Sequence, residues 1–208
     1  GLVTFYIDSR LLVERLNSVV GAAGWEDTYR LLTEGEFIVM LDCDHVPSAE
    51  FLERTLGFFL QDPKLFLVQT PHHLVNPDPL ERNLATFNHS PSENDMFYNT
   101  IQPGLDAWGA TFFCGSAAML RRSALDDIGG FSQQTLTEDA ETTLRALSRG
   151  YTTAYLNLPL ISGLQPETFS GFIQQRARWG QGMWQIFMFH NPWTLPGLSL
   201  IQRVLFTN

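Results

Sequence analysis

The sequence has 208 residues with 13 basic and 22 acidic side chains, which gives a formal net charge of −9. Because 44% of the residues are hydrophobic and 17% are charged, the chain can bury a core and is not a disordered segment. The acidic balance argues against nucleic acid as the main partner, since phosphate backbones bind basic surfaces.

The cysteines and the start of the sequence limit the classes further. Cys43 and Cys114 form neither a disulfide framework nor a zinc motif. Residues 1–10 lack the basic start and apolar run of a signal peptide, and the first residue is not Met, so we expect an excerpt of a longer chain. The longest apolar run, residues 37–41, is far shorter than the roughly 20 residues of a transmembrane helix.

Hydrophobic periodicity predicts helices that alternate with strands. Helices are predicted over residues 9–19, 47–61, 81–107 with interruptions, 135–149 and 166–179. Strands are predicted over residues 37–41, 65–70, 112–114 and 151–158. Residues 71–80 contain three prolines and form a predicted loop. This alternation favours an α/β fold with a mainly parallel sheet, in which ligands bind at the carboxyl ends of the strands.

Two aspartates follow the apolar run 37–41. In an extended chain, Asp42 and Asp44 point to the same side, roughly 6.5 Å apart. Two carboxylates in this arrangement can hold a hard cation such as Mg²⁺. The alternative is a polar strand end with Asp44 near a helix N-cap. His45 is either a further metal ligand or a solvated loop residue.

The helix predicted over residues 135–149 begins with acidic residues. Thr135 and Glu138 have the spacing of a capping box, and Gly150 is the expected end of the helix. Glu138 and Asp139 can be ordinary partners of the helix dipole. Alternatively, one of them is a general base that takes a proton from a hydroxyl in a partly desolvated cleft.

A third motif lies near the end of the last predicted helix. Gln175, Arg178 and Trp179 stand three and four residues apart and therefore share one helix face. An Arg side chain suits pyrophosphate, and a Trp ring suits stacking on a sugar. The alternative is a packed Trp179 and a solvated Arg178. The segment that follows, residues 179–202, contains no Asp, Glu, Lys or Arg. It would either lie in a membrane interface or form a hydrophobic helix on which a missing domain docks.

The order of these three motifs resembles the processive family 2 glycosyltransferases. The resemblance is closest to the catalytic subunits of bacterial cellulose synthases (UDP-forming) and covers about residues 35–208. Hyaluronan and chitin synthases share the three short motifs. The stretches that carry the resemblance are residues 41–47, 68–72, 76–79, 112–118, 137–142, 163–169 and 175–179.

The resemblance implies a GT-A fold, which is a Rossmann-like α/β domain, incomplete here at its N-terminal end. Residues 1–179 would be the partial catalytic domain, and residues 180–208 an amphipathic membrane-interface segment leading toward an absent transmembrane helix. The implied location is the cytoplasmic face of the bacterial inner membrane. The implied partners are UDP-glucose, the growing glucan chain, the lipid interface and other cellulose synthase subunits.

The implied reaction is an inverting, processive transfer of glucose from UDP-glucose to the 4-hydroxyl of a growing β-1,4-glucan. By the resemblance, Asp139 is the general base. The implied ligands of Mg²⁺ or Mn²⁺ are Asp42, Asp44 and His45. The implied donor-binding residues are Asp42, Asp44, Gln175 and Arg178, and the implied acceptor-binding residues are Trp179, Glu138 and Cys114. One base suffices because a cation and Arg178 would stabilise the departing diphosphate.

The sequence departs from the family at residues 22–25, which read Ala-Ala-Gly-Trp where the family has Lys-Ala-Gly-Asn. The family's upstream strand and early aspartate motif are also missing, so we expect the excerpt alone to be inactive. A degenerate synthase paralogue that acts as a scaffold is one alternative, and a hyaluronan- or chitin-type synthase is another. A haloacid dehalogenase-type phosphatase with Asp42 as nucleophile would leave the second and third motifs unexplained.

Overall fold

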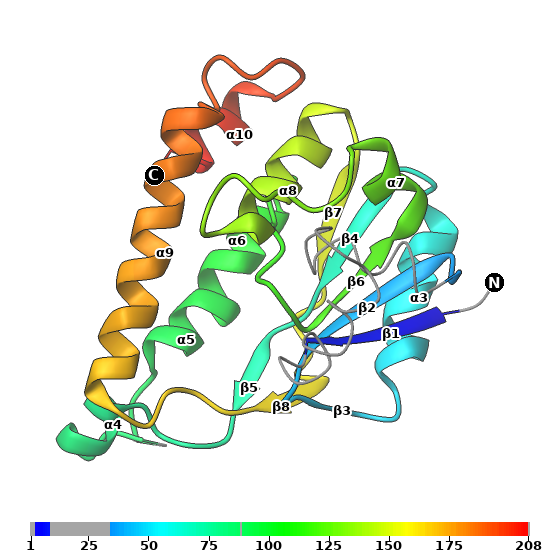
Figure 1. Ribbon diagram of the computed structural model, residues 1–208. Coiled ribbons are helices and arrows are strands. Elements are labelled where there is room, and N and C mark those ends of the chain that lie inside the picture. Colours follow the sequence, from blue (N-terminus) through cyan, green and yellow to red (C-terminus); the bar gives the residue numbers. More distant parts are fainter. Residues whose placement is uncertain (1–2, 9–33, 88, 208) are drawn as a thin grey trace, which may run out of the picture.

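The computed structural model describes residues 3–8, 34–87 and 89–207, and Figure 1 shows a sheet flanked by helices. The helix predicted over residues 9–19 and the departure at residues 22–25 lie outside the described residues. The main sheet has the order β1-β2-β6-β4-β7. Its strands are β1 (Val3–Asp8), β2 (Phe37–Asp42), β6 (Ala118–Arg121), β4 (Leu65–Gln69) and β7 (Thr152–Tyr155).

The sheet is mixed. β1 pairs with β2 in parallel, and β4 pairs with β7 in parallel. β6 runs antiparallel to both of its neighbours, β2 and β4. Four strands therefore share one direction, as the alternation of elements predicted, but a fifth strand of opposite direction lies in the middle.

Both faces of the main sheet are buried. Alternate side chains of β2 point to opposite faces, so Ile38 and Met40 belong to one hydrophobic cluster and Phe37, Val39 and Leu41 to another. Helix α7 (Arg122–Asp127) contributes to the first cluster, and helix α3 (Phe51–Gln61) contributes to the second. Burial on both faces explains why the strand at residues 37–41 reads as a continuous apolar run.

A second, small sheet lies at the edge where β2 and β4 end. It has the order β3-β8-β5, with β3 (Val46–Pro47), β8 (Ile161–Gly163) and β5 (His72–Leu74). The predicted loop at residues 71–80 was therefore wrong in part, because β5 pairs in parallel with the distant strand β8. The helix predicted from residue 47 begins at Phe51, because Val46 and Pro47 pair with β8.

The strand predicted over residues 112–114 is wrong. Its backbone amides bond to side chains instead of to a neighbouring strand: Phe113 N donates to Thr143 Oγ1, and Cys114 N donates to Gln69 Oε1, both over 2.9 Å. Gly115 then takes a positive φ of 82°, which ends any extended conformation. The strand in this region is β6, which begins only at Ala118.

The remaining helices follow the sequence with shifted ends. The interrupted helical region contains α4 (Pro79–Leu84), α5 (Glu93–Met96), η2 (Phe97–Ile101) and α6 (Gln102–Asp106). Helix α8 (Glu138–Ser148) begins later than predicted, because the Thr135 hydroxyl donates to Glu141 Oε2 and caps no helix. Gly150, with a φ of 83°, follows its end as predicted.

The last two helices form one side of the molecule (Figure 1). Helix α9 (Phe169–Phe189) begins after the cap Thr168 and continues ten residues past Trp179, through the expected boundary between residues 179 and 180. Helix α10 (Leu200–Leu205) follows a turn. Within the described part of the chain, no helix is both long enough and apolar enough to cross a membrane.

Candidate functional site

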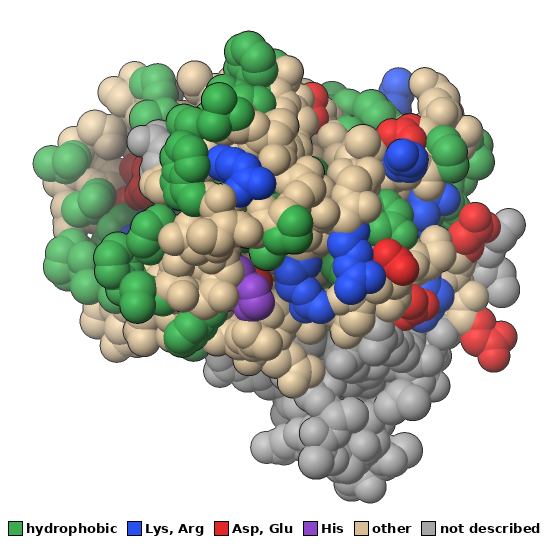
Figure 2. Space-filling view, turned by 90° about the horizontal axis from the view of Figure 1, so that it is seen from above, with side chains coloured by type: hydrophobic (Ala, Val, Ile, Leu, Met, Phe, Trp, Pro, Cys, Tyr) green, Lys and Arg blue, Asp and Glu red, His purple; other side chains and the backbone are tan. Residues whose placement is uncertain are grey.

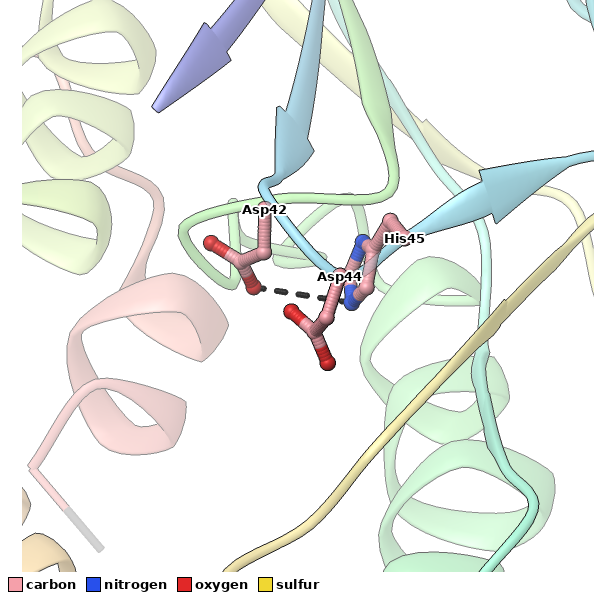
Figure 3. Close-up of side chains that lie close together, drawn as sticks. All are labelled: Asp42, Asp44 and His45. Atoms are coloured by element: carbon pink, nitrogen blue, oxygen red, sulfur yellow. Dashed lines mark ion pairs between the residues drawn. The ribbon is translucent and has the colours of Figure 1, made fainter. Parts of the chain in front are cut away.

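Asp42, Asp44 and His45 form a compact group where β2 ends. Their possible ligand atoms all lie within 4.8 Å of one another. Figure 3 shows the two carboxylates and the imidazole ring facing one another, with Asp42 Oδ2 and His45 Nε2 3.5 Å apart. A tight turn brings them together, because His45 N donates to Asp42 O over 3.0 Å.

Segments far away in the sequence hold this group in place. The Ser116 hydroxyl donates to Asp42 Oδ2 over 2.7 Å, and Leu164 N donates to Asp44 Oδ2 over 2.8 Å. The imidazole is packed closely against β8, since a Cβ at Gly163 would lie 2.5 Å from His45 Cδ2. Asp44 therefore caps no helix, and His45 is not a solvated loop residue, since only 3% of its side chain is exposed.

The group fits a divalent cation. It offers two carboxylates, which are the oxygen ligands that Mg²⁺ and Mn²⁺ prefer, with an imidazole beside them. The Asp42 side chain is 48% exposed, so one side of the group stays open to a phosphate-bearing ligand. The buried Nδ1 of His45 has no hydrogen-bond partner, so this ring is fixed by packing and by its Nε2 contact.

Asp139 lies in the first turn of α8, next to the loop that precedes β6. Its Oδ1 accepts a hydrogen bond from Ala140 N over 2.8 Å. A Cβ at Gly115 would lie 3.4 Å from its Oδ2, so the loop passes directly over the carboxyl group. Burial raises the pKa of Asp139 to about 7, the negative charge of Glu138 adds to the rise, and the charge of Arg178 opposes it.

The loop at residues 112–117 lies between the two acidic centres. Ser116 contacts Asp42, while Cys114 and Gly115 are neighbours of Asp139. The buried Gln69, at the end of β4, fixes this loop by accepting from Cys114 N and donating to Ser116 O, both over 2.9 Å. Because β6 is antiparallel, the loop before it meets the ends of β2 and β4.

Cys114 is a half-buried thiol at this position. Burial and the nearby Asp139 carboxyl raise the pKa of the Cys114 thiol well above its usual range. The Gln102 side chain contacts it, with 3.1 Å between Gln102 Nε2 and Cys114 Sγ. The thiol is therefore protonated at neutral pH and can only be a neutral neighbour of a ligand.

Two aromatic residues that the motifs did not single out complete this region. The His72 ring centroid lies 5.2 Å from that of His45 and 5.1 Å from that of Tyr98. Burial lowers the pKa of His72 to about 4, so the ring is neutral, and Nε2 carries the proton because it lies 3.1 Å from the carbonyl oxygen of Ser116. Burial and nearby acidic groups, including Cys114, Asp139 and Asp42, raise the pKa of Tyr98.

The sequence indicated one of these two residues, His72. His72 follows the end of β4, which is where ligands bind in such sheets. Tyr98 lies inside the irregular helix η2, and nothing in its local sequence marks it. A cavity of about 220 Å³ adjoins both residues, whereas a larger one of about 1060 Å³ is lined by residues 89–100 and contains no predicted site residue.

The third motif lies in the N-terminal half of α9. Arg178 is exposed, and its charge acts on Asp139. Trp179 is 39% exposed, so it is not packed in the core, and the Arg176 guanidinium lies 4.3 Å from its ring centroid. Gln175 Oε1 accepts from Arg176 Nη1 over 2.8 Å. The structure thus brings Arg178 toward Asp139, while the described contacts of Gln175 and Trp179 are with Arg176.

Comparison with known proteins shows which family has this arrangement of residues. Residues 37–207 match the family described as glycosyl transferase family group 2. The chain belongs to this family. It is 51% identical over 174 residues to a cellulose synthase catalytic subunit (UDP-forming) of Komagataeibacter sucrofermentans, and 45% identical over 196 residues to one of Xanthomonas axonopodis pv. citri. These matches cover 84% and 94% of this chain, which spans 23% and 27% of the length of the two relatives.

A solved structure supports the fold of this glycosyltransferase chain. The mannosyltransferase of Pyrobaculum calidifontis, in complex with GDP-Man and Mn²⁺, aligns with a TM-score of 0.58 at 21% sequence identity. The alignment covers 88% of this chain and 53% of the mannosyltransferase. The GT-A fold and the family resemblance are therefore confirmed, and the phosphatase alternative is wrong. The roles assigned to individual side chains stay predictions.

Proposed function

We propose that this chain is the catalytic core of an inverting, processive glucosyltransferase of cellulose synthesis. It would transfer glucose from UDP-glucose to the 4-hydroxyl of a growing β-1,4-glucan. The observation that carries the proposal is that one loop, residues 112–117, contacts the candidate metal group through Ser116 and the candidate base Asp139 through Gly115. The identity of 45–51% to cellulose synthase catalytic subunits supports the choice of sugar and product.

The donor side would be formed by Asp42, Asp44 and His45. These residues would hold Mg²⁺ or Mn²⁺, and the Mn²⁺ in the complex of the related mannosyltransferase supports this assignment. A bound divalent cation would supply positive charge for the diphosphate that leaves with UDP. Arg178 and Gln175 would bind the same diphosphate from α9, since an Arg side chain can donate two parallel hydrogen bonds to it.

The acceptor side would be formed around Asp139. The acceptor O4 attacks C1 of glucose, the bond from C1 to the UDP oxygen breaks, and the proton of the hydroxyl moves to Asp139. A carboxylate with a pKa of about 7 is a stronger base than an ordinary aspartate, and it is still largely ionised slightly above neutral pH. Glu138, Cys114 and Trp179 would line the place of the acceptor sugar, with Trp179 as the stacking ring.

The proposal extends to the location of the protein. α9 and α10 expose large apolar side chains, including Trp184, Met188, Phe189 and Leu200. Figure 2 shows hydrophobic side chains gathered on the side of the molecule that carries α9. This surface suits the lipid interface at the cytoplasmic face of a bacterial inner membrane, where Trp side chains are favoured. Other cellulose synthase subunits would assemble with the complete protein there.

Binding of UDP-glucose to the full-length protein tests the donor site. Binding measured by calorimetry should require Mg²⁺ or Mn²⁺ and should be abolished by EDTA. Asp42→Asn and Asp44→Asn should weaken metal-dependent binding by about 10-fold or more, since loss of even an outer partner of a metal ligand typically costs about that much. Glu53→Gln removes an exposed carboxylate from α3 and should leave binding unchanged.

The outcome also separates the alternatives. Binding that is equally strong with EDTA would contradict the proposed metal site. A protein that binds no UDP-glucose under any condition would favour the degenerate scaffold, and faster transfer from another UDP-sugar would favour a hyaluronan- or chitin-type synthase.

A further inference from the structure

The face of α9 that carries the third motif continues toward the end of the helix. Gln175, Arg178 and Trp179 share a face with Gly182 and Gln185, because these positions follow one another at intervals of three or four residues. His190 comes directly after the last helical residue, Phe189. The first part of the face lies beside Asp139, as the effect of Arg178 shows. The second part is in contact with the residues that precede and begin α8.

Gly182 and Gln185 contact the segment immediately before Glu138 and Asp139. A Cβ at Gly182 would lie 2.7 Å from Thr137 N and 2.5 Å from Thr137 Oγ1, so only a glycine allows the two backbones to approach this closely. One turn later, Gln185 Oε1 accepts a hydrogen bond from Leu136 N over 2.8 Å.

His190 makes the third contact, at the end of α9. Its Nε2 lies 3.0 Å from Glu141 Oε1 and 2.8 Å from Gln134 Oε1. The Glu141 side chain is 1% exposed, and its Oε2 accepts from the Thr135 hydroxyl over 2.8 Å. His190 therefore joins a buried carboxylate of α8, two residues after Asp139, to the turn that leads into the helix.

We propose that Gly182, Gln185 and His190 are positioning residues, which hold the start of α8 and with it the Asp139 carboxylate in a fixed place relative to Arg178. This inference rests on the proposed function, because it concerns the geometry of the candidate base. None of the three residues needs to touch a substrate. Their effect passes through the backbone of residues 134–141.

The proposal has an electrostatic consequence. The charged and titratable groups around Asp139 are Glu138 on its own helix, Arg178 from α9, Tyr98 from η2 and Cys114 from the loop. Arg178 is the cation among them, and its charge lowers the pKa of Asp139. A displacement of α9 would move Arg178 away and so raise the pKa of Asp139. The acid limb of the pH–rate profile, which is the pH range in which transfer slows as the pH falls, would then move to higher pH.

Two glycine substitutions in α9 of the full-length protein test this. Gly182→Ala introduces the methyl group that meets Thr137, whereas Gly180→Ala is the matched control, since a Cβ there meets nothing within 4 Å. We expect Gly182→Ala to lower kcat by about 10²-fold, as for a displaced catalytic group, and to move the acid limb upward in pH. Gly180→Ala should change neither quantity.

A second measurement does not depend on activity. Gln185→Ala removes the acceptor of the Leu136 amide, and Gln185→Glu keeps an acceptor at the same place. Hydrogen–deuterium exchange of residues 136–141 should become faster in Gln185→Ala and Gly182→Ala but not in Gln185→Glu or Gly180→Ala. Exchange that is equal in all four variants would overturn the inference.

The two proposals fail in different ways. An unmodified protein without metal-dependent transfer would contradict the proposed function, while the exchange rates would still decide whether α9 holds the start of α8. Normal metal-dependent transfer with indistinguishable pH profiles for Gly182→Ala and Gly180→Ala would overturn the positioning role and leave the function intact.

Discussion

Asp42 and Asp139 are the same residue type in two different settings. Asp42 ends strand β2, is 48% exposed and accepts a hydrogen bond from Ser116. Asp139 lies under the loop at Gly115, where burial and Glu138 raise its pKa to about 7. A partly exposed carboxylate suits a metal ion and a phosphate, whereas a desolvated one suits proton transfer. The settings therefore support different roles for the two side chains.

The pKa of Asp139 predicts the pH dependence of transfer. The rate should fall as the pH drops below about 7, because the protonated carboxyl group cannot accept the proton of the acceptor hydroxyl. Asp139→Asn should lower kcat by about 10²–10⁴-fold, the usual contribution of a general base, without weakening UDP binding. A pH–rate profile and a binding titration check this, and transfer that survives in Asp139→Asn would exclude Asp139 as the base.

The same shift predicts an effect on stability. The folded-state pKa is raised from 3.8 to about 7, so the unfolded state releases this proton at a lower pH than the folded state does. Asp139 therefore lowers the free energy of unfolding as the pH rises between these two values. Asp139→Asn should raise the melting temperature at pH 8 relative to the unmodified protein, and the gain should disappear near pH 4.

The sequence predicted helix α8, but it did not predict that α8 packs against α9. The apolar and acidic pattern of α8 and its end at Gly150 are local features, and the sequence predicted them. The start of α8 was misplaced because Thr135 bonds to Glu141 instead of capping the helix. The partner of Glu141 on the other side is His190, 49 residues later, and no local pattern joins the two.

The contact between His190 and Glu141 predicts a measurable loss of stability. His190→Ala should lower the free energy of unfolding by about 1–3 kcal/mol, because it removes the polar group that faces the buried Glu141 carboxylate, 3.0 Å from its Oε1. Urea unfolding checks this, with His73→Ala as a control on an exposed histidine. Since the two side chains contact each other, the cost of His190→Ala should be smaller in a Glu141→Gln background, and purely additive costs would contradict the contact.

The molecule as a whole consists of a sheet that is covered on both faces and a third cluster that attaches α9 and the residues on either side of α10. Ile186 of α9 is buried in this third cluster. Its buried partners there are Ala140, Leu144, Leu147 and Leu198. The candidate base and the third motif are therefore joined by the apolar contacts of this cluster as well as by polar ones.

Truncation of Ile186 should show how much this cluster contributes. Ile186→Ala should lower the free energy of unfolding by about 2–5 kcal/mol, through lost burial and the cavity that remains. Ile173→Ala, on the exposed side of the same helix, should change it by less than about 0.5 kcal/mol. Equal costs for both substitutions in urea unfolding would mean that α9 is not held by this cluster.

The sequence by itself determined the features that depend on neighbouring residues. The strands at residues 37–42 and 65–69 are apolar runs, so burial on both faces of a sheet could be predicted from them. Asp42 ends such a strand and Asp44 follows two residues later, so the sequence placed both carboxylates at the end of a strand. The turn that brings them together, and the bonds from Ser116 and Leu164 that fix them, appear only in the folded molecule. The sequence motifs likewise identified the family, which the match over residues 37–207 confirmed.

Tertiary contacts determined the rest, because they depend on residues far apart in the chain. Insertion of β6 between β2 and β4 brings Ser116 to Asp42, although 74 residues separate them. Gln69 and Thr143 side chains bind the amides of residues 113–114, which local β propensity had assigned to a strand. Tyr98 and His190 acquire their neighbours only when helices pack, since burial and charge around a side chain are properties of the folded molecule.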